Sequence, residues 1–192
     1  MKIVKLIRYF AEFLIIILFF MILKLLGIKV ASYLSGKIFS IIGPFFRSKI
    51  IINSNLNTAF PNSSLKEKKA LINDMWNYYG RVFAEYLFLK DFRNNSKKIN
   101  IQIEGKEILE DLKKNKENVI FISGHFDNFE LMAMCLEKQE INLAAIYRPL
   151  NNFFLDKIMV FLRKKYICKN QIKKGRSSVR ELVRLFKNGY SI

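Results

Sequence analysis

An uninterrupted apolar run near the N-terminus constrains this chain more than any other feature. Residues 13–23 read FLIIILFFMIL, and only Glu12 and Lys24 interrupt the wider apolar stretch Phe10–Leu26. A helix that crosses a bilayer needs about 20 apolar residues, and charges near its ends can reach the headgroups. We therefore expect residues 1–27 to form an uncleaved N-terminal membrane anchor, either a transmembrane helix or a deeply embedded one.

A cleaved signal peptide is the alternative for this segment, because Lys2, Lys5 and Arg8 give it a charged start. No clear small-x-small cleavage site follows, and residues 31–33 (Ala-Ser-Tyr) are a poor match. Basic residues are more numerous after the segment than before it, which favours a cytoplasmic catalytic domain under the positive-inside rule. Whether the helix spans the membrane or lies in it is left open.

The charge balance points to anionic partners. The 192 residues include 33 Lys and Arg against 16 Asp and Glu, a formal net charge of +17. Nucleic acid, anionic lipid headgroups and phosphorylated substrates all fit this excess. The apolar helix favours a lipid surface, and the absence of a recognised nucleic-acid-binding motif argues against nucleic acid. Cys135 and Cys168 show no disulfide or zinc spacing, and no Gly-rich phosphate loop occurs, so we expect no metal and no bound cofactor.

Residues 28–100 have the pattern of a helical region. Gly43-Pro44 is expected to interrupt it, and Ser64 with Glu67 fits a capping box that opens a later helix. The polar residues 94–98 (Asn-Asn-Ser-Lys-Lys) mark the boundary to a different pattern.

Residues 101–192 alternate strands with helices, which predicts βαβ units, a parallel sheet and an α/β fold. Val119–Ile122 and Leu143–Tyr147 are the predicted strands. The predicted helix starts are a capping box of Asp127 with Glu130, a cap at Asn151 or Asn152, and a cap at Ser178 with Glu181; Gly189 is the predicted C-terminal cap. Because the chain stops where another strand would begin, we expect this α/β core to be incomplete.

His125 is the only histidine, and it follows the first predicted strand directly after Ser123-Gly124. Open α/β sheets bind ligands at the carboxyl ends of their strands. A neutral imidazole can take a proton from an attacking hydroxyl, and a carboxylate such as Glu130, five residues later, can orient the ring and stabilise its cation. The same spacing would also occur if His125 were a packed structural residue and Glu130 only a capping residue. Asp127 is a rival for the orienting carboxylate. The spacing alone therefore does not establish a catalytic role.

The sequence around His125 resembles a known family. The stretch SGHFDNFELMAM, residues 123–134, resembles the His-x4-Asp/Glu block of the lysophospholipid acyltransferase superfamily, and more narrowly that of the lipid A biosynthesis lauroyl/myristoyl acyltransferases. Three further stretches resemble the narrower family: NLNTAFPNSSLKEKKALINDMWNYYGRVFAEYL at 55–87, YRPLNNFFLDKIM at 147–159 and KKGRSSVRELVRLFKNGYSI at 173–192. The resemblance runs from the apolar helix to the last residue.

The resemblance implies a membrane helix and helical region followed by the first βαβ units of a glycerolipid-acyltransferase-like sheet. It implies transfer of a fatty acyl group from an acyl carrier protein thioester to a hydroxyl of a phosphorylated glycolipid, a lipid A precursor, in lipopolysaccharide biosynthesis. His125 would be the general base and Glu130 its orienting partner. Arg148 and Asn152 match the second block, where the arginine would meet a substrate phosphate or the developing oxyanion, and Arg176 is either a phosphate contact or a solvated basic residue.

The same resemblance implies that the protein acts at the cytoplasmic face of an inner membrane. Because the family continues with a further strand and an acidic block, it also implies that this chain is truncated. Two alternatives stay open: an acyltransferase for another membrane lipid, and a non-catalytic basic protein of an anionic membrane surface. The grouping of His125, Glu130 and Arg148 at the ends of predicted strands favours an enzyme.

Overall fold

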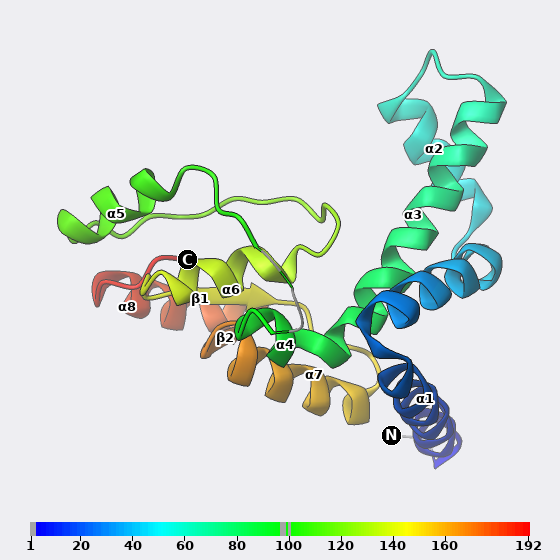
Figure 1. Ribbon diagram of the computed structural model, residues 1–192, viewed down its shortest axis with the longest axis horizontal. Coiled ribbons are helices and arrows are strands. Elements are labelled where there is room, and N and C mark those ends of the chain that lie inside the picture. The colour runs from blue at the N-terminus through cyan, green and yellow to red at the C-terminus, as the bar shows by residue number, and fades with distance from the viewer. Residues whose placement is uncertain (1–2, 97–98, 100) are drawn as a thin grey trace. The chain divides into compact units, whose positions relative to one another are not determined.

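The computed structural model describes residues 3–96, 99 and 101–192 (Figure 1). Lys2 of the charged start, and Lys97 and Lys98 of the polar boundary, lie outside the described residues. The chain forms two compact units. One consists of Phe19–Phe88, and the other combines Met1–Leu18 with Leu89–Ile192.

The N-terminal helix α1 covers Ile3–Ile42 and is bent at Gly27, whose φ of 74° and ψ of 162° are not helical. A glycine tolerates this backbone conformation because it has no Cβ. Among the described residues, one helical stretch, Ile3–Phe45, is long and apolar enough to cross a membrane, with a mean hydropathy of 2.7 over its best 18-residue window. Most of that window is exposed. By length and composition, α1 therefore meets the requirement for the expected anchor.

In the unit Phe19–Phe88, the second part of α1 packs against α3 (Leu65–Glu85) through small residues. A Cβ on Gly80 would lie 2.4 Å from the backbone oxygen of Ser35 and 2.9 Å from the Cα of Gly36. Small residues at such a crossing let two helix backbones approach closely. The hydroxyl of Ser32 donates to Glu85 Oε1 over 2.8 Å at the same interface.

A second contact in this unit is aromatic. The ring of Phe83 on α3 lies 4.7 Å from that of Phe20 and 5.2 Å from that of Phe39, measured between ring centroids. The 3-10 turn η2 (Tyr86–Phe88) ends the unit and contributes the buried Phe88. The Lys24 ammonium lies 4.2 Å from the centre of the Phe88 ring and donates to the carbonyl of Leu87.

The predicted interruption at Gly43-Pro44 is confirmed: α1 gives way to a 3-10 turn, η1 (Gly43–Phe45), and then to α2 (Lys49–Ala59). The predicted capping box is also confirmed, because Ser64 Oγ accepts from Glu67 N and the Glu67 carboxylate accepts from Ser64 N at the start of α3. α2 and α3 run side by side, and the Lys68 ammonium donates to Asn57 Oδ1 between them (Figure 1).

The other unit contains the α/β part. Its helices are α4 (Leu89–Arg93), α5 (Lys106–Lys114), α6 (Glu130–Lys138), α7 (Phe153–Tyr166) and α8 (Val179–Lys187), with a 3-10 turn η3 (Arg176–Ser178) and strands β1 (Ala144–Tyr147) and β2 (Asn170–Lys173). α4 packs against both α6 and α7. The buried core includes Met134 of α6, Ala144 of β1 and Ile172 of β2.

The sheet contains one complete βαβ unit. β1 and β2 pair in parallel, with Ala144 opposite Asn170 and Tyr147 opposite Lys173, and α7 connects them. The strand predicted over residues 143–147 is thus confirmed as β1 with its start at Ala144, whereas β2 was not predicted. The chain as a whole is mostly helical, and its α/β character rests on this small parallel sheet.

The last two residues extend the sheet beyond β1. Leu143 bridges Ser191 in parallel, with Ser191 N donating to Asn142 O and Ala144 N to Ser191 O. On the other side, Ile192 N donates to Val119 O over 3.0 Å and Phe121 N to Ile192 O over 2.7 Å, the alternation of a parallel pair. The segment 119–121, residues 191–192, β1 and β2 therefore lie in that order and run in one direction.

Two expectations for this region were wrong. Val119–Ile122 does not form a regular buried strand; within the described part of the chain its backbone pairs with Ser191 and Ile192, and the Ile122 side chain is 92% exposed. The predicted capping box of Asp127 with Glu130 is absent, since α6 starts at Glu130 without a side-chain cap. Asp127 instead adopts a left-handed backbone with φ 43°.

The remaining helix ends follow the sequence closely. Asn152 caps α7, with Oδ1 accepting from Phe154 N and Leu155 N. α8 starts after Ser178, although without the predicted side-chain cap. Gly189, with φ 81°, follows the last turn of α8 as expected for a C-terminal cap.

The close crossing of α1 and α3 gives a stability prediction. We expect Gly80→Val to lower the free energy of unfolding by about 1–3 kcal/mol, because its Cβ would be forced against the Ser35 backbone. Thermal unfolding of the detergent-solubilised protein measures this. The control is Gly175→Val, where the nearest atom to the new Cβ is Ser177 Oγ at 3.9 Å; equal melting temperatures for the two variants would contradict the described packing.

Candidate functional site

Three of the residues predicted for the site follow the carboxyl ends of parallel segments. His125 comes after the segment 119–121, Arg148 directly after β1, and Arg176 three residues after β2. Because these segments run in one direction, their carboxyl ends lie at the same edge of the sheet. All three side chains are exposed, and among the described residues they make no direct hydrogen bond to one another. The edge is thus an open, positively charged surface.

The His125 ring lies in the loop between the segment 119–121 and α6. It contacts the ring of Phe129, at 4.4 Å between centroids and 61° between planes, an edge-to-face arrangement. A Cβ on Gly124 would lie 2.4 Å from the Phe126 ring. The glycine before the histidine therefore makes room for a neighbouring side chain in this loop.

Glu130 is buried and forms an ion pair with Arg163 of α7. Oε1 of Glu130 accepts from Arg163 Nε over 2.9 Å and from Arg163 Nη2, and the two side chains are 8% and 15% exposed. The Arg163 guanidinium also lies 5.9 Å from the centre of the Tyr147 ring. Burial, and to a smaller extent the negative charge of Asp156, raise the pKa of the Tyr147 hydroxyl above its usual value.

Arg163, the ion-pair partner of the candidate residue Glu130, was not predicted from the sequence. It begins the basic run Arg163-Lys164-Lys165 at the end of α7, and the two lysines are exposed while the arginine is not. Helical spacing could have indicated that Arg163 is partly buried, because it lies on the same face of α7 as Met159, four residues before it, and Tyr166, three residues after it. Both of these residues are also partly buried.

Asn152 is buried and serves the framework of this unit. Its Oδ1 caps α7, and its Nδ2 donates to Tyr9 O over 2.8 Å and to Glu12 Oε2 over 3.2 Å on α1. Together these bonds engage both polar atoms of the Asn152 amide. A contact of Asn152 with substrate stays a prediction.

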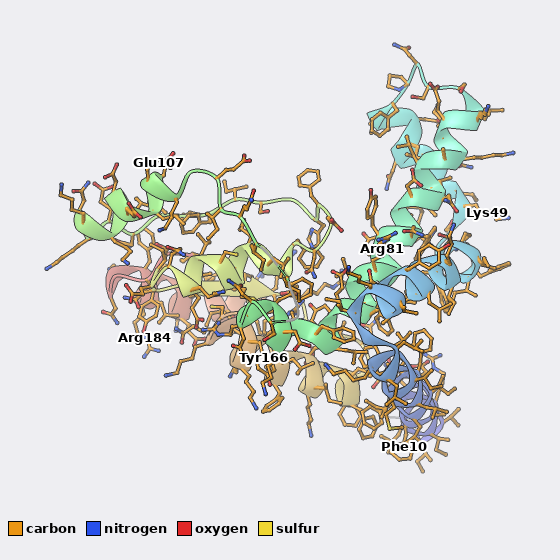
Figure 2. The ribbon with its side chains drawn as sticks, viewed as in Figure 1. Phe10, Lys49, Arg81, Glu107, Tyr166 and Arg184 are labelled. Carbon is orange, nitrogen blue, oxygen red and sulfur yellow. The ribbon has the colours of Figure 1, made fainter. Side chains whose placement is uncertain are left out.

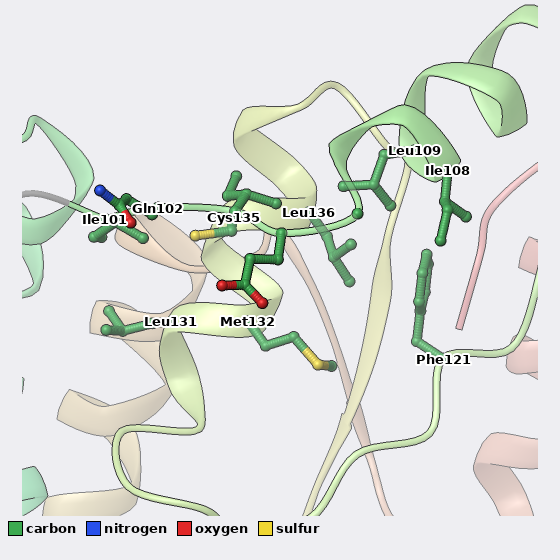
Figure 3. A pocket seen from close by; sticks show the side chains of 12 residues that line it. Ile101, Gln102, Ile108, Leu109, Phe121, Leu131, Met132, Cys135 and Leu136 are labelled. Carbon is green, nitrogen blue, oxygen red and sulfur yellow. The ribbon is translucent and has the colours of Figure 1, made fainter.

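An apolar cavity of about 470 Å³ lies beside α6 (Figure 3). Residues of α6, of α5 and of the segment before α5 line the cavity, together with Phe121, which precedes the His125 loop. The lining residues are Leu131, Met132, Cys135 and Leu136 of α6, Ile108 and Leu109 of α5, and residues 101–105. Burial raises the pKa of the Cys135 thiol, which keeps that wall of the cavity uncharged at neutral pH. The cavity suits an apolar ligand.

A metal centre has no support in the described part of the chain, where no group of three or more His, Cys, Asp or Glu side chains is placed to hold an ion. The polar groups at or near the carboxyl edge of the sheet include the His125 imidazole, the buried Glu130 carboxylate and the guanidinium groups of Arg148 and Arg176.

The family profile described as bacterial lipid A biosynthesis acyltransferase matches residues 2–192. The chain therefore belongs to this family, which confirms the resemblance found in the sequence.

Individual relatives are distant. The chain is similar to the lipid A biosynthesis myristoyltransferase of Escherichia coli (strain K12), 24% identical over 131 residues that make up 68% of this chain and 40% of that protein. Lipid A biosynthesis acyltransferase 1 of Shigella flexneri gives the same identity and coverage, and acyltransferase 2 of that organism is 25% identical over 58% of this chain and 36% of its own length. The matches thus span about two-fifths of these relatives. No solved structure matches the chain.

The buried ion pair gives the prediction for this region. We expect Arg163→Met to lower the free energy of unfolding by about 3 kcal/mol, because it removes the guanidinium that compensates the buried Glu130 carboxylate. Urea unfolding of the purified protein measures the loss. Lys164→Met, on the exposed side of the same helix, is the matched control and should change stability by less than about 0.5 kcal/mol.

A double-mutant cycle separates the pair from its surroundings. Glu130→Leu combined with Arg163→Met should cost clearly less than the sum of the two single losses, since the double variant leaves no uncompensated charge of this pair. Additive losses would mean that the two side chains do not stabilise each other.

Proposed function

We propose that the protein transfers a fatty acyl group from an acyl carrier protein thioester to a hydroxyl of a lipid A precursor. The observation that carries the proposal is the position of His125, Arg148 and Arg176 after three parallel segments, in a chain that belongs to the lipid A acyltransferase family. Open α/β sheets bind their ligands at this edge.

In the proposed reaction, neutral His125 removes the proton of the acceptor hydroxyl. The oxygen attacks the thioester carbonyl carbon and forms a tetrahedral intermediate whose negative charge the Arg148 guanidinium can stabilise. The intermediate collapses with cleavage of the carbon–sulfur bond, and the imidazolium returns the proton to the departing thiolate. The products are a new ester and free carrier thiol, so His125 is regenerated in each turnover.

Glu130 is proposed to orient His125. Arg163 donates to Oε1 of Glu130, and in the proposal the Glu130 carboxylate also accepts from a ring N–H of His125, which selects the tautomer whose other nitrogen faces the hydroxyl. Arg163 would then be a positioning residue that fixes the carboxylate from α7. Because the pair is buried, this carboxylate has little freedom to rotate away.

The substrate contacts follow from charge and polarity. Arg148 and Arg176 are exposed guanidinium groups at one edge of the sheet, which suits the phosphates of a lipid A precursor. The apolar cavity beside α6 is proposed to hold the acyl chain, because the helix that begins with Glu130 also supplies its wall. Asn152 is proposed to contribute mainly by fixing the start of α7.

The proposed setting is the cytoplasmic face of an inner membrane. α1 supplies an apolar helix of sufficient length, and the excess of basic residues after it favours the cytoplasmic side. The net charge of +17 suits an anionic membrane surface and an acidic carrier protein.

Transfer to another membrane lipid is the second candidate function, and the exposure of Arg148 and Arg176 favours it equally, since any phosphorylated headgroup offers the same oxygens. Parallel assays with a lipid A precursor and with a glycerol-phosphate lipid distinguish the two acceptors.

The catalytic prediction concerns His125. In membranes containing the protein expressed from its full reading frame, His125→Ala should lower the turnover number about 10²–10⁴-fold, because it removes the general base. Labelled acyl carrier protein and a lipid A precursor provide the assay. Asp127→Asn is the control for the rival carboxylate and should retain most of the activity, whereas Glu130→Gln should lower it.

Activity that survives His125→Ala, or the absence of transfer to any acceptor by folded, membrane-bound protein, would contradict the proposal. A loss with Asp127→Asn equal to that of Glu130→Gln would instead assign the orienting role to Asp127.

The cavity gives a separate prediction on acyl length. Met132→Trp should shift the preference towards shorter acyl donors by filling part of the apolar space, while the volume-conserving Met132→Leu should leave the preference unchanged. Competition between acyl carrier proteins loaded with chains of different length measures the shift. If both variants showed the same acyl-length preference, the acyl chain would not bind in this cavity.

A further inference from the structure

The turn between α1 and α2 exposes an unusual amount of apolar surface. Phe45, Phe46 and Ile50 are 85%, 75% and 81% exposed, and Ile41 and Ile51 are also exposed. Helix α2, eleven residues long, has no buried residue. We call residues 41–51 the α1–α2 turn. Clustered apolar side chains of this size are unfavourable in water and mark a surface that something else covers.

The packing of the turn holds these side chains outward. Gly43 is buried against α3, where a Cβ would lie 2.2 Å from Cδ2 of Trp76. Phe46 N closes η1 by donating to Gly43 O over 2.9 Å. With Gly43 fixed on the Trp76 ring, the phenylalanines that follow it remain on the outside of the unit.

The charged residues within the turn, and before it in the sequence back to residue 13, have one sign. Arg47 and Lys49 alternate with the apolar residues, and Figure 2 marks Lys49 at the start of α2. The sequence contains no Asp or Glu from residue 13 to residue 66, whereas six basic residues fall in this stretch. The next acidic residue, Glu67, is engaged by Ser64 in the capping box of α3. The turn therefore combines aromatic and aliphatic side chains with basic residues and contains no acidic one.

We propose that the α1–α2 turn is a second membrane-contact site, which inserts Phe45, Phe46 and Ile50 into the interfacial region of an anionic bilayer. Arg47 and Lys49 bind the lipid phosphates around these side chains. Short apolar segments with basic residues bind membranes in this way, through buried apolar area together with attraction to anionic lipids.

The observations favour a lipid surface over a protein partner. A protein interface of this charge would need a complementary acidic patch, whereas anionic headgroups supply negative charge over the whole area beside an apolar phase. The turn is also continuous with α1, whose exposed Met21, Ile22 and Leu25 lie in the same unit. Residues 28–42 of α1 place the turn about 22 Å along the helix from Gly27, so the two contacts are separate.

The test introduces a tryptophan at the turn of the full chain in lipid vesicles. Phe45→Trp is compared with the parent, whose sole tryptophan is Trp76, and with Val183→Trp at an exposed apolar position of α8. The vesicles contain brominated phosphatidylcholine with or without phosphatidylglycerol, and acrylamide serves as the aqueous quencher. We expect the added emission at position 45 to be blue-shifted, and quenched several-fold more by brominated lipid than that at position 183.

The basic residues are tested in the Phe45→Trp background. Arg47→Glu with Lys49→Glu should reduce the lipid quenching in phosphatidylglycerol vesicles, while Lys66→Glu with Lys69→Glu, an equal charge change on α3, should not. A tryptophan at position 45 that acrylamide reaches freely in every vesicle would overturn the proposal. Protection from both quenchers would also overturn it, because the turn would then be covered by protein.

Discussion

The arrangement around the candidate site depends on one buried ion pair. Glu130 begins α6, directly after the loop that carries His125, and Arg163 lies near the end of α7, which follows Arg148 and Asn152. Pairing the two charges away from water is favourable only when both side chains are held in position. The pair therefore ties the helix after the His125 loop to the helix that follows Arg148 and Asn152, and a shift of either helix would separate the two buried charges.

The sequence predicted those helix caps and turns that depend on interactions between neighbouring residues. The cap at Asn152, the capping box of Ser64 with Glu67, the interruption at Gly43 and the turn at Gly189 each depend on a few neighbouring residues, and all are present. Asp127 with Glu130 has the same local pattern as Ser64 with Glu67, yet no box forms there. The Glu130 carboxylate instead pairs with Arg163, 33 residues later, and no local pattern reveals such a partner.

The positions of the candidate residues along the chain were predictable, but their contacts were not. The position of His125 and Arg148 after extended segments could be inferred from the sequence, and the parallel order of the segments supports it. The partner of Glu130 depends on how α7 packs, and the two roles of Asn152 depend on the proximity of Tyr9 and Glu12 on α1. These are contacts between residues far apart in the sequence, and no local sequence pattern indicates that such residues lie close together in space.

The position of residues 191–192 between the segment 119–121 and β1 has a consequence for the order of folding. Val119 and Phe121 take their backbone partners from Ile192, more than 70 residues later. During synthesis, α6, β1, α7 and β2 can assemble first, whereas the segment that leads into the His125 loop acquires its neighbour only when the last of these residues emerges from the ribosome. Closing so long a loop is entropically slow. The loop that carries His125 is therefore expected to be among the last parts of this unit to become ordered, long after α1 has left the ribosome.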